Sequence, residues 1–190
     1  MTKTRSRRSG CIVFFLLLLL AAVFLYAPVR DAIAKYLYPT KYSALVETYG
    51  EANGLQLSLV YAVIKNESSF RPDAVSSIGA RGLMQMTEET FDWVQSRRGG
   101  DESFDDLFDP ETSIDYGCYL LSVLLTEFGS VENALCAYHA GWGSVKQWLD
   151  NPEYSDDGAT LDHIPFGDTR SYVKKVLDSI EIYQDLYGIA

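Results

Sequence analysis

Apolar residues recur at intervals of three and four along most of the chain after residue 40, which is the spacing of one face of a helix. The longest such series follows Asp109 and Pro110, a pair that favours the start of a helix. Its apolar positions are Ile114, Cys118, Leu121, Leu124, Leu125 and Phe128. Because no segment alternates apolar and polar residues over any length, the pattern predicts an all-α fold.

Residues with side-chain oxygens precede several of these series and predict where helices begin. Ser58, Thr87 and Ser130 each stand at the start of one series, and Thr169 starts a last helix that we expect to reach the C-terminus. The helix after Ser58 is expected to end at Glu67. The stretch that follows, SSFRPDAVSSIGARGLMQ, contains a proline, two glycines and four serines, so it predicts an irregular loop.

The N-terminal part of the chain follows a different pattern. Residues 11–27, CIVFFLLLLLAAVFLYA, are an uncharged apolar run that would extend roughly 25 Å as a helix, enough for a membrane span. Residues 1–10 carry a basic cluster, so the positive-inside rule predicts a cytoplasmic N-terminus and an extracytoplasmic remainder. We therefore expect a transmembrane anchor at 11–27, a stalk at 28–40 and one globular domain at 41–190.

A cleaved signal peptide would share the charged start and the apolar middle of this segment. The best cleavage site is Leu25-Tyr26-Ala27, which has a large residue at its third-last position and is followed directly by Pro28. Both features disfavour cleavage. An uncleaved anchor is the favoured interpretation, with cleavage as the alternative.

Acidic residues dominate the chain after residue 30, where 11 basic and 26 acidic residues leave a net charge of −15. This charge argues against nucleic-acid binding. The three cysteines show no metal-ligand spacing, and the sequence contains no cofactor motif. Cys118 and Cys136 lie in apolar helical stretches and are expected to be small buried residues, although an extracytoplasmic location would also permit a bond between them.

Glu67 is the first candidate for chemistry, because it stands where the apolar stretch VYAVIK meets a loop rich in glycine and serine. A carboxyl group that is partly shielded from water has a raised pKa and can hold a proton near neutrality, as a general acid must. Position alone favours the alternative, an exposed glutamate at a helix end. The motif around Glu67 favours the catalytic role.

The segment from Glu67 to Gln85 resembles the lytic transglycosylase domain of the soluble lytic transglycosylase type. That family has the pattern E-S-x-F-x-x-x-A-x-S-x-x-G-A-x-G-L-M-Q. This chain matches it at Glu67, Ser68, Phe70, Ala74, Ser76, Gly79, Ala80, Gly82, Leu83, Met84 and Gln85. Two further blocks follow in the family's order, ALCAYHAGWGSVKQWL at 134–149 and IPFGDTRSYVKKV at 164–176.

The resemblance covers roughly residues 41–190 and implies a lysozyme-like fold with a groove for peptidoglycan glycan strands. It also implies a lyase reaction that needs no cofactor. Glu67 would protonate the glycosidic oxygen after a muramic acid residue and then act as base on the 6-hydroxyl of that sugar. A 1,6-anhydro end results. No second carboxylate is required, unlike in most glycosidases, and Asp73 is the only other acid within the motif.

Further site residues are carried over by motif position. Ser76 and Gln85 would bind the sugar next to the scissile bond through a hydroxyl and an amide, which are neutral groups that do not stabilise an ionised Glu67. Tyr138 stands at the tyrosine of the family's A-Y-N-A-G block and is expected to lie close to Glu67. Gly79 and Gly82 are interpreted as structural, either as backbone turns with positive φ or as points where the chain closely approaches the sugar.

The chain departs from the family at several positions. His139 replaces the asparagine of the A-Y-N-A-G block; it can still donate and accept hydrogen bonds like an amide, but it titrates near neutrality, so the activity is expected to depend more on pH. Asp168 replaces a glutamate and either contacts substrate or only supports Arg170 and Tyr172. Thr87 and its neighbours replace an aliphatic residue and Met-Pro, which puts the shape of the groove on that side in question.

Two other functions remain open. A hydrolytic lysozyme would use the same glutamate but add water in place of the 6-hydroxyl. A wall-binding module would keep the groove with little or no chemistry. The expected location is the bacterial cell membrane, with the catalytic domain outside, and such a protein could open the wall locally for a wall-spanning machine.

Overall fold

The computed structural model describes Tyr26 and residues 28–189 and divides into two compact units, Met1–Pro39 and Thr40–Ala190. In the first unit, residues 28–37 are helical. The basic segment at 1–10 and all of the expected anchor except Tyr26 lie outside the described residues. Among the residues that are described, no helix is both long enough and apolar enough to cross a membrane.

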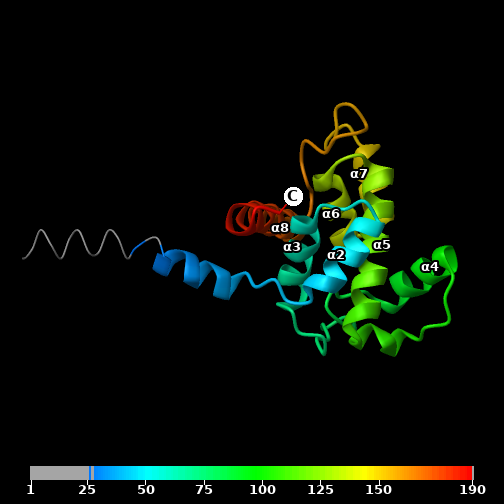
Figure 1. Ribbon diagram of the computed structural model, residues 1–190. Helices are drawn as coiled ribbons and strands as arrows, with labels where there is room; N and C mark the ends of the chain where they lie inside the picture. Colours follow the sequence, from blue (N-terminus) through cyan, green and yellow to red (C-terminus); the bar gives the residue numbers. More distant parts are fainter. Residues whose placement is uncertain (1–25, 27, 190) are drawn as a thin grey trace, which may run out of the picture. The chain divides into compact units, whose positions relative to one another are not determined.

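The second unit is built from helices, as the spacing of apolar residues predicts (Figure 1). In chain order these are α2 (Ser43–Ala52), α3 (Leu57–Ser68), α4 (Glu88–Arg98), the 3-10 helix η1 (Phe104–Phe108), α5 (Pro110–Phe128), α6 (Val131–Ala140), α7 (Trp142–Leu149) and α8 (Gly167–Tyr187). The described part of the chain has no strand, only isolated β-bridges that join Arg81 to Val75 and to Met86. The all-α prediction is confirmed for these residues.

Three predicted helix starts are confirmed by side-chain caps. The side chains of Thr87, Asp109 and Ser130 precede α4, α5 and α6, and each accepts a hydrogen bond from the backbone NH three residues further on. Such a bond satisfies one of the free NH groups of the first turn. These starts depend on local contacts alone.

Two predicted starts are wrong. Helix α3 begins at Leu57, so Ser58 lies inside it, and α8 begins at Gly167, so Thr169 lies inside it. Both side chains are almost fully buried and bond to distant residues instead of capping. The hydroxyl of Thr169 pairs with His139 at 3.1 Å, and that of Ser58 accepts from Gln184 at 3.5 Å.

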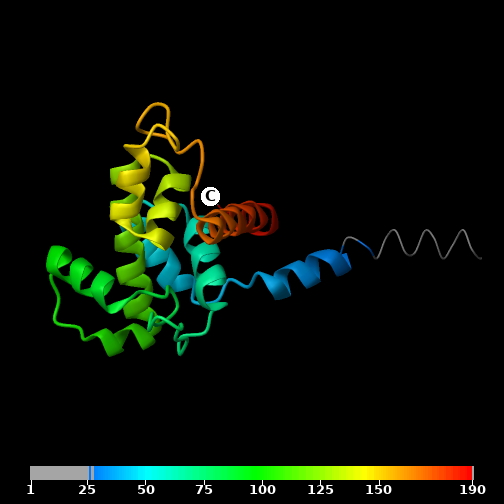
Figure 2. The same cartoon turned by 180° about the vertical axis from the view of Figure 1, so that it is seen from behind.

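Helix α3 lies between α2 and α8 in both views of the molecule (Figures 1 and 2). Residues 59–64 of this helix are all buried, as expected for a helix that is enclosed by other elements. This packing holds the C-terminal end of α3, and with it Glu67, against α8. On the neighbouring pair α5 and α6, Cys118 and Cys136 are buried and free, which confirms their interpretation as small core residues.

Candidate active site

Glu67 lies in the last turn of α3, and Tyr172 of α8 donates a hydrogen bond to its Oε1 at 2.6 Å. Burial raises the pKa of the Glu67 carboxyl from 4.5 to about 7, while the bond from Tyr172 lowers it. Burial has the larger effect because the carboxylate form loses most of its hydration. Glu67 therefore exchanges a proton near neutral pH, which both a general acid and a general base require.

The sequence did not predict Tyr172 as a site residue in its own right. Burial, followed by the charge of Glu67, raises the pKa of its phenol well above the usual range, so the phenol stays protonated and acts as a donor. The available signal was its place in the block TRSYV, two residues after Arg170. The bond to Glu67 depends on the contact between α3 and α8.

His139 is exposed, and its ring stacks on Tyr172 with centroids 4.5 Å apart and an interplanar angle of 29°. Its Nδ1 pairs with the hydroxyl of Thr169 at 3.1 Å. Burial lowers the pKa of His139 and the charge of Asp168 opposes that shift. The exposed Asp168 accepts a bond from the backbone NH of Thr169 at 2.9 Å.

Tyr138 projects from α6, and its hydroxyl donates to the carbonyl oxygen of Met84 at 2.6 Å. Burial and then the charge of Glu67 raise the pKa of this phenol well above the usual range. The hydrogen bond to Met84 thus joins α6 to the loop after α3.

The side chains of Ser76 and Gln85 bond within their own loop. The Ser76 hydroxyl accepts from the Ala80 NH at 3.0 Å. The amide nitrogen of Gln85 donates to the carbonyls of Ala74 and Gly82 at 3.0 and 2.9 Å. These bonds stabilise the conformation of the loop. They use the hydroxyl oxygen of Ser76 and the amide nitrogen of Gln85, so the hydroxyl hydrogen of Ser76 and the amide oxygen of Gln85 take no part in them.

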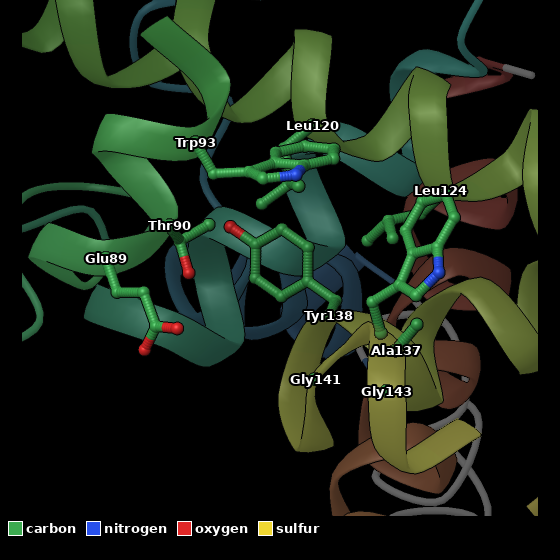
Figure 3. Close-up of a pocket in the computed structure, with 10 residues that line it drawn as sticks. Glu89, Thr90, Trp93, Leu120, Leu124, Ala137, Tyr138, Gly141 and Gly143 are labelled. Carbon is green, nitrogen blue, oxygen red and sulfur yellow. The ribbon is translucent and has the colours of Figure 1, made fainter. Parts of the chain in front are cut away.

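A pocket of about 350 Å³ opens on Tyr138 and extends away along α4, α5 and α7. Its lining consists of Glu89, Thr90, Trp93, Leu120, Leu124, Ala137, Tyr138, Gly141, Trp142 and Gly143. Figure 3 shows Trp93, Thr90 and Glu89 of α4 around the hydroxyl end of Tyr138. A volume of this size is in the range of small-ligand sites, about 300–1,000 Å³. The described residues hold no group of three or more His, Cys, Asp or Glu placed to bind a metal.

Tyr172→Phe is expected to raise the pKa of Glu67. The substitution removes a hydrogen bond that stabilises the carboxylate form in the wild-type protein. In the wild-type protein the folded pKa of about 7 exceeds the unfolded value of 4.5, so the free energy of unfolding falls as pH rises between them. A hydrogen bond to a charged group contributes about 1.5 kcal/mol or more, which corresponds to about one pKa unit. In the variant the free energy of unfolding should therefore continue to fall to a pH about one unit higher.

Carbon NMR of the Glu67 carboxyl and denaturant unfolding across pH measure this shift. Tyr138→Phe is the matched control, because it removes a phenol hydroxyl that bonds to a backbone carbonyl and not to Glu67. Equal titration midpoints in wild type and Tyr172→Phe would contradict the assigned hydrogen bond.

The chain is similar to known proteins over most of its length. The family model of the transglycosylase SLT domain matches residues 44–160. The soluble lytic murein transglycosylase of Escherichia coli is 34% identical over 155 residues, which cover 80% of this chain and 24% of that protein. The membrane-bound lytic murein transglycosylase C of Yersinia enterocolitica is 33% identical over 167 residues, 76% of this chain and 47% of that protein. The chain thus spans less than half the length of these relatives.

Solved structures of lytic transglycosylases are also similar to this chain. The 70 kDa soluble lytic transglycosylase of Escherichia coli aligns with a TM-score of 0.72 and 30% identity, covering 82% of this chain and 26% of that chain. A complex of the 70 kDa soluble lytic transglycosylase with bulgecin A aligns with the same TM-score, identity and coverage. Lytic transglycosylase Slt of Pseudomonas aeruginosa, solved as an inactive glutamate-to-glutamine mutant, aligns with a TM-score of 0.68 and 32% identity over 78% of this chain and 24% of that chain.

Proposed function

This chain belongs to the family of transglycosylase SLT domains, with a lysozyme-like helical fold, and from that membership we propose that it is a peptidoglycan lytic transglycosylase. The observation that carries the proposal is the carboxyl of Glu67, which is partly buried and whose pKa of about 7 lets it hold and release a proton at neutral pH. The named relatives that act on murein support the choice of substrate.

The proposed reaction uses Glu67 twice. As general acid, it gives its proton to the oxygen that links a muramic acid residue to the next sugar, and the bond from C1 to that oxygen breaks. As general base, the resulting carboxylate takes the proton of the 6-hydroxyl on the same muramic acid, and a bond forms between C1 and O6. The glutamate returns to its starting form and no water is consumed.

Tyr172 is proposed to assist both steps by stabilising the carboxylate that exists between them. Its phenol stays protonated and donates to Oε1, so it compensates part of the cost of a buried charge. His139 would act on Tyr172 through the stacked rings, and its own substrate contact remains a prediction.

Substrate-binding roles are proposed for the other candidates. Ser76 can donate its hydroxyl hydrogen to a sugar oxygen while it accepts from Ala80, and Gln85 can accept a sugar hydroxyl through its amide oxygen. The ring of Tyr138 can pack on a sugar face. Asp168 is exposed and available to a substrate hydroxyl, or it supports only Arg170 and Tyr172.

We also propose that residues 11–27 anchor the chain in the bacterial cell membrane, with 1–10 inside, a stalk at 28–40 and the catalytic domain at 41–190 outside. The uncharged apolar run and the basic residues before it support this arrangement. One relative is named as membrane-bound. An anchored wall-cutting enzyme would suit a machine that crosses the wall, and normal placement of such a machine in a deletion strain would count against that role.

Product analysis tests the proposed activity. The full-length chain in a mild detergent is incubated with peptidoglycan beside its Glu67→Gln variant, and the released muropeptides are analysed by mass spectrometry. Anhydro-muramic ends, each lighter than a reducing end by one water and absent with Glu67→Gln, are the expected products. Reducing ends would mean a hydrolytic lysozyme, and sedimentation with the wall without any release would mean a binding module.

A further inference from the structure

The helix at residues 28–37, drawn in blue in Figure 1, carries an exposed apolar face. The described part of the chain has eight exposed large apolar side chains, and five of them belong to this short segment. These five are between 50% and 84% exposed. They are Tyr26, Val29, Ile33, Tyr36 and Leu37. Because water is a poor environment for an apolar face, this face is suited to contact with another apolar surface.

The five side chains form one continuous stripe. They follow Tyr26 at intervals of three, seven, ten and eleven residues, which on a helix confines them to a sector about 100° wide. The charged residues lie elsewhere on the helix. Asp31 and Lys35 fall on the opposite side, and Arg30, which pairs with Asp31 at 2.7 Å, falls at the edge of the stripe. The helix is therefore amphipathic.

The composition of this helix fits the boundary between lipid and water. Three charged residues within 28–37 make burial in the hydrocarbon core of a bilayer costly. The apolar stripe disfavours full exposure to water. At the membrane interface both groups are satisfied, since tyrosines place their rings at the level of the headgroups and long basic side chains extend their charges into water.

The sequence before the helix supplies the bilayer that this face would contact. The uncharged apolar run proposed as the membrane anchor ends at residue 27, and the helix at 28–37 begins with the next residue. A helix that starts at that point starts at the membrane surface. Pro28 has no backbone NH to donate, which permits the chain to change direction there.

A second copy of the chain is a less suitable partner. The spacing of Tyr26, Val29, Ile33 and Tyr36 matches the apolar positions of a heptad repeat. The stripe covers only twelve residues, however, and this is fewer than two heptads. A stable coiled coil is indicated by three or four heptads. The short stripe, the tyrosines and the adjoining apolar run therefore favour lipid.

We propose that residues 26–37 form an interfacial helix on the outer surface of the membrane, with the apolar stripe toward the acyl chains and Asp31 and Lys35 toward water. The inference rests on the membrane anchor of the proposed function and is independent of the reaction. A helix of ten residues that stood upright would carry the chain about 15 Å outward. Lying flat, it would keep Thr40, where the globular unit begins, close to the membrane.

The test uses the full-length chain in vesicles of phosphatidylcholine and phosphatidylglycerol, with an environment-sensitive fluorophore attached to Ile33→Cys or to Lys35→Cys. Cys11 is replaced by alanine, and the buried Cys118 and Cys136 are kept, with the parent chain as the control for their labelling. The label at 33 is expected to emit at shorter wavelength and to be quenched by nitroxide lipids. The label at 35 is expected to be quenched by iodide in the water.

A matched pair of charge variants tests the stripe itself, with the label attached to Val29→Cys. Ile33→Glu places a charge within the stripe and should shift the emission of this label to longer wavelength. Lys35→Glu introduces the same side chain on the opposite face and should leave the emission unchanged.

Three results would overturn the inference. Equal quenching by iodide at 33 and 35, in a chain that still floats with the vesicles, would refute the interfacial helix and leave the anchor intact. A chain that does not float with the vesicles would refute both. Energy transfer between labelled copies that disappears on dilution with unlabelled chain would assign the stripe to a second copy. Release of anhydro-muramic ends tests the reaction separately in every case.

Discussion

Glu67→Gln is expected to lower the release of anhydro-muramic products by about 100- to 10,000-fold, the usual contribution of general acid–base catalysis. Glutamine keeps the size of the side chain and can still accept from Tyr172, but it cannot give or take a proton. Initial rates on purified peptidoglycan, quantified by mass spectrometry, measure the effect.

The same substitution should make the fold more stable above neutral pH. The folded pKa of Glu67, about 7, lies above the unfolded 4.5, so wild-type stability falls as pH rises through this window and stays low above it. A neutral glutamine avoids that loss, which is about 3 kcal/mol for a pKa difference of about 2.5. A gain in stability together with lost activity would separate a catalytic role from a structural one.

Asp73→Asn is the matched control, because Asp73 is an acid in the same motif but is exposed to solvent. It should not change the rate appreciably. If Asp73→Asn lowered the rate as much as Glu67→Gln, the assignment of Glu67 as the single catalytic carboxyl would be wrong.

Gly82→Ala is expected to destabilise the protein by about 3–5 kcal/mol, a large part of the roughly 5–15 kcal/mol that stabilises a typical domain. The φ of Gly82 is 77°, which disfavours any side chain. A Cβ at this position would also lie 2.0 Å from the carbonyl oxygen of Leu107 and 2.8 Å from the hydroxyl of Ser113. The loop after α3 would have to leave η1 and α5.

Gly79→Ala separates the two causes. Gly79 has a similar φ of 84°, but a Cβ there would meet no heavy atom within 4 Å. Its cost should therefore be only the conformational one, about 1–2 kcal/mol. Denaturant unfolding of the two variants measures both effects, and equal costs would mean that the close approach of Gly82 to Leu107 is unimportant.

Gly79 and Gly82 have similar backbone conformations but different surroundings. Their spacing within the motif predicted turns with positive φ, and the structure confirms both. The sequence did not distinguish the two glycines. Only Gly82 lies close to the backbone of Leu107, and that contact joins residues far apart in the sequence. The structure alone makes one glycine a packing position and the other only a turn.

The sequence by itself determined the features that depend on neighbouring residues. The starts of α4, α5 and α6 followed from Thr87, Asp109 and Ser130, because an oxygen three residues before a free NH can cap a helix wherever the helix lies. The all-α class followed equally from periodicity. The motif around Glu67 identified the candidate acid.

Only the tertiary structure decided the features that depend on burial and on distant partners. Ser58 and Thr169 are buried inside their helices because packing gives their hydroxyls other partners. Tyr172 meets Glu67 across 105 residues of sequence, and burial between α3 and α8 gives that glutamate its pKa of about 7. A pKa depends on hydration and on nearby groups, and these exist only once the helices have packed.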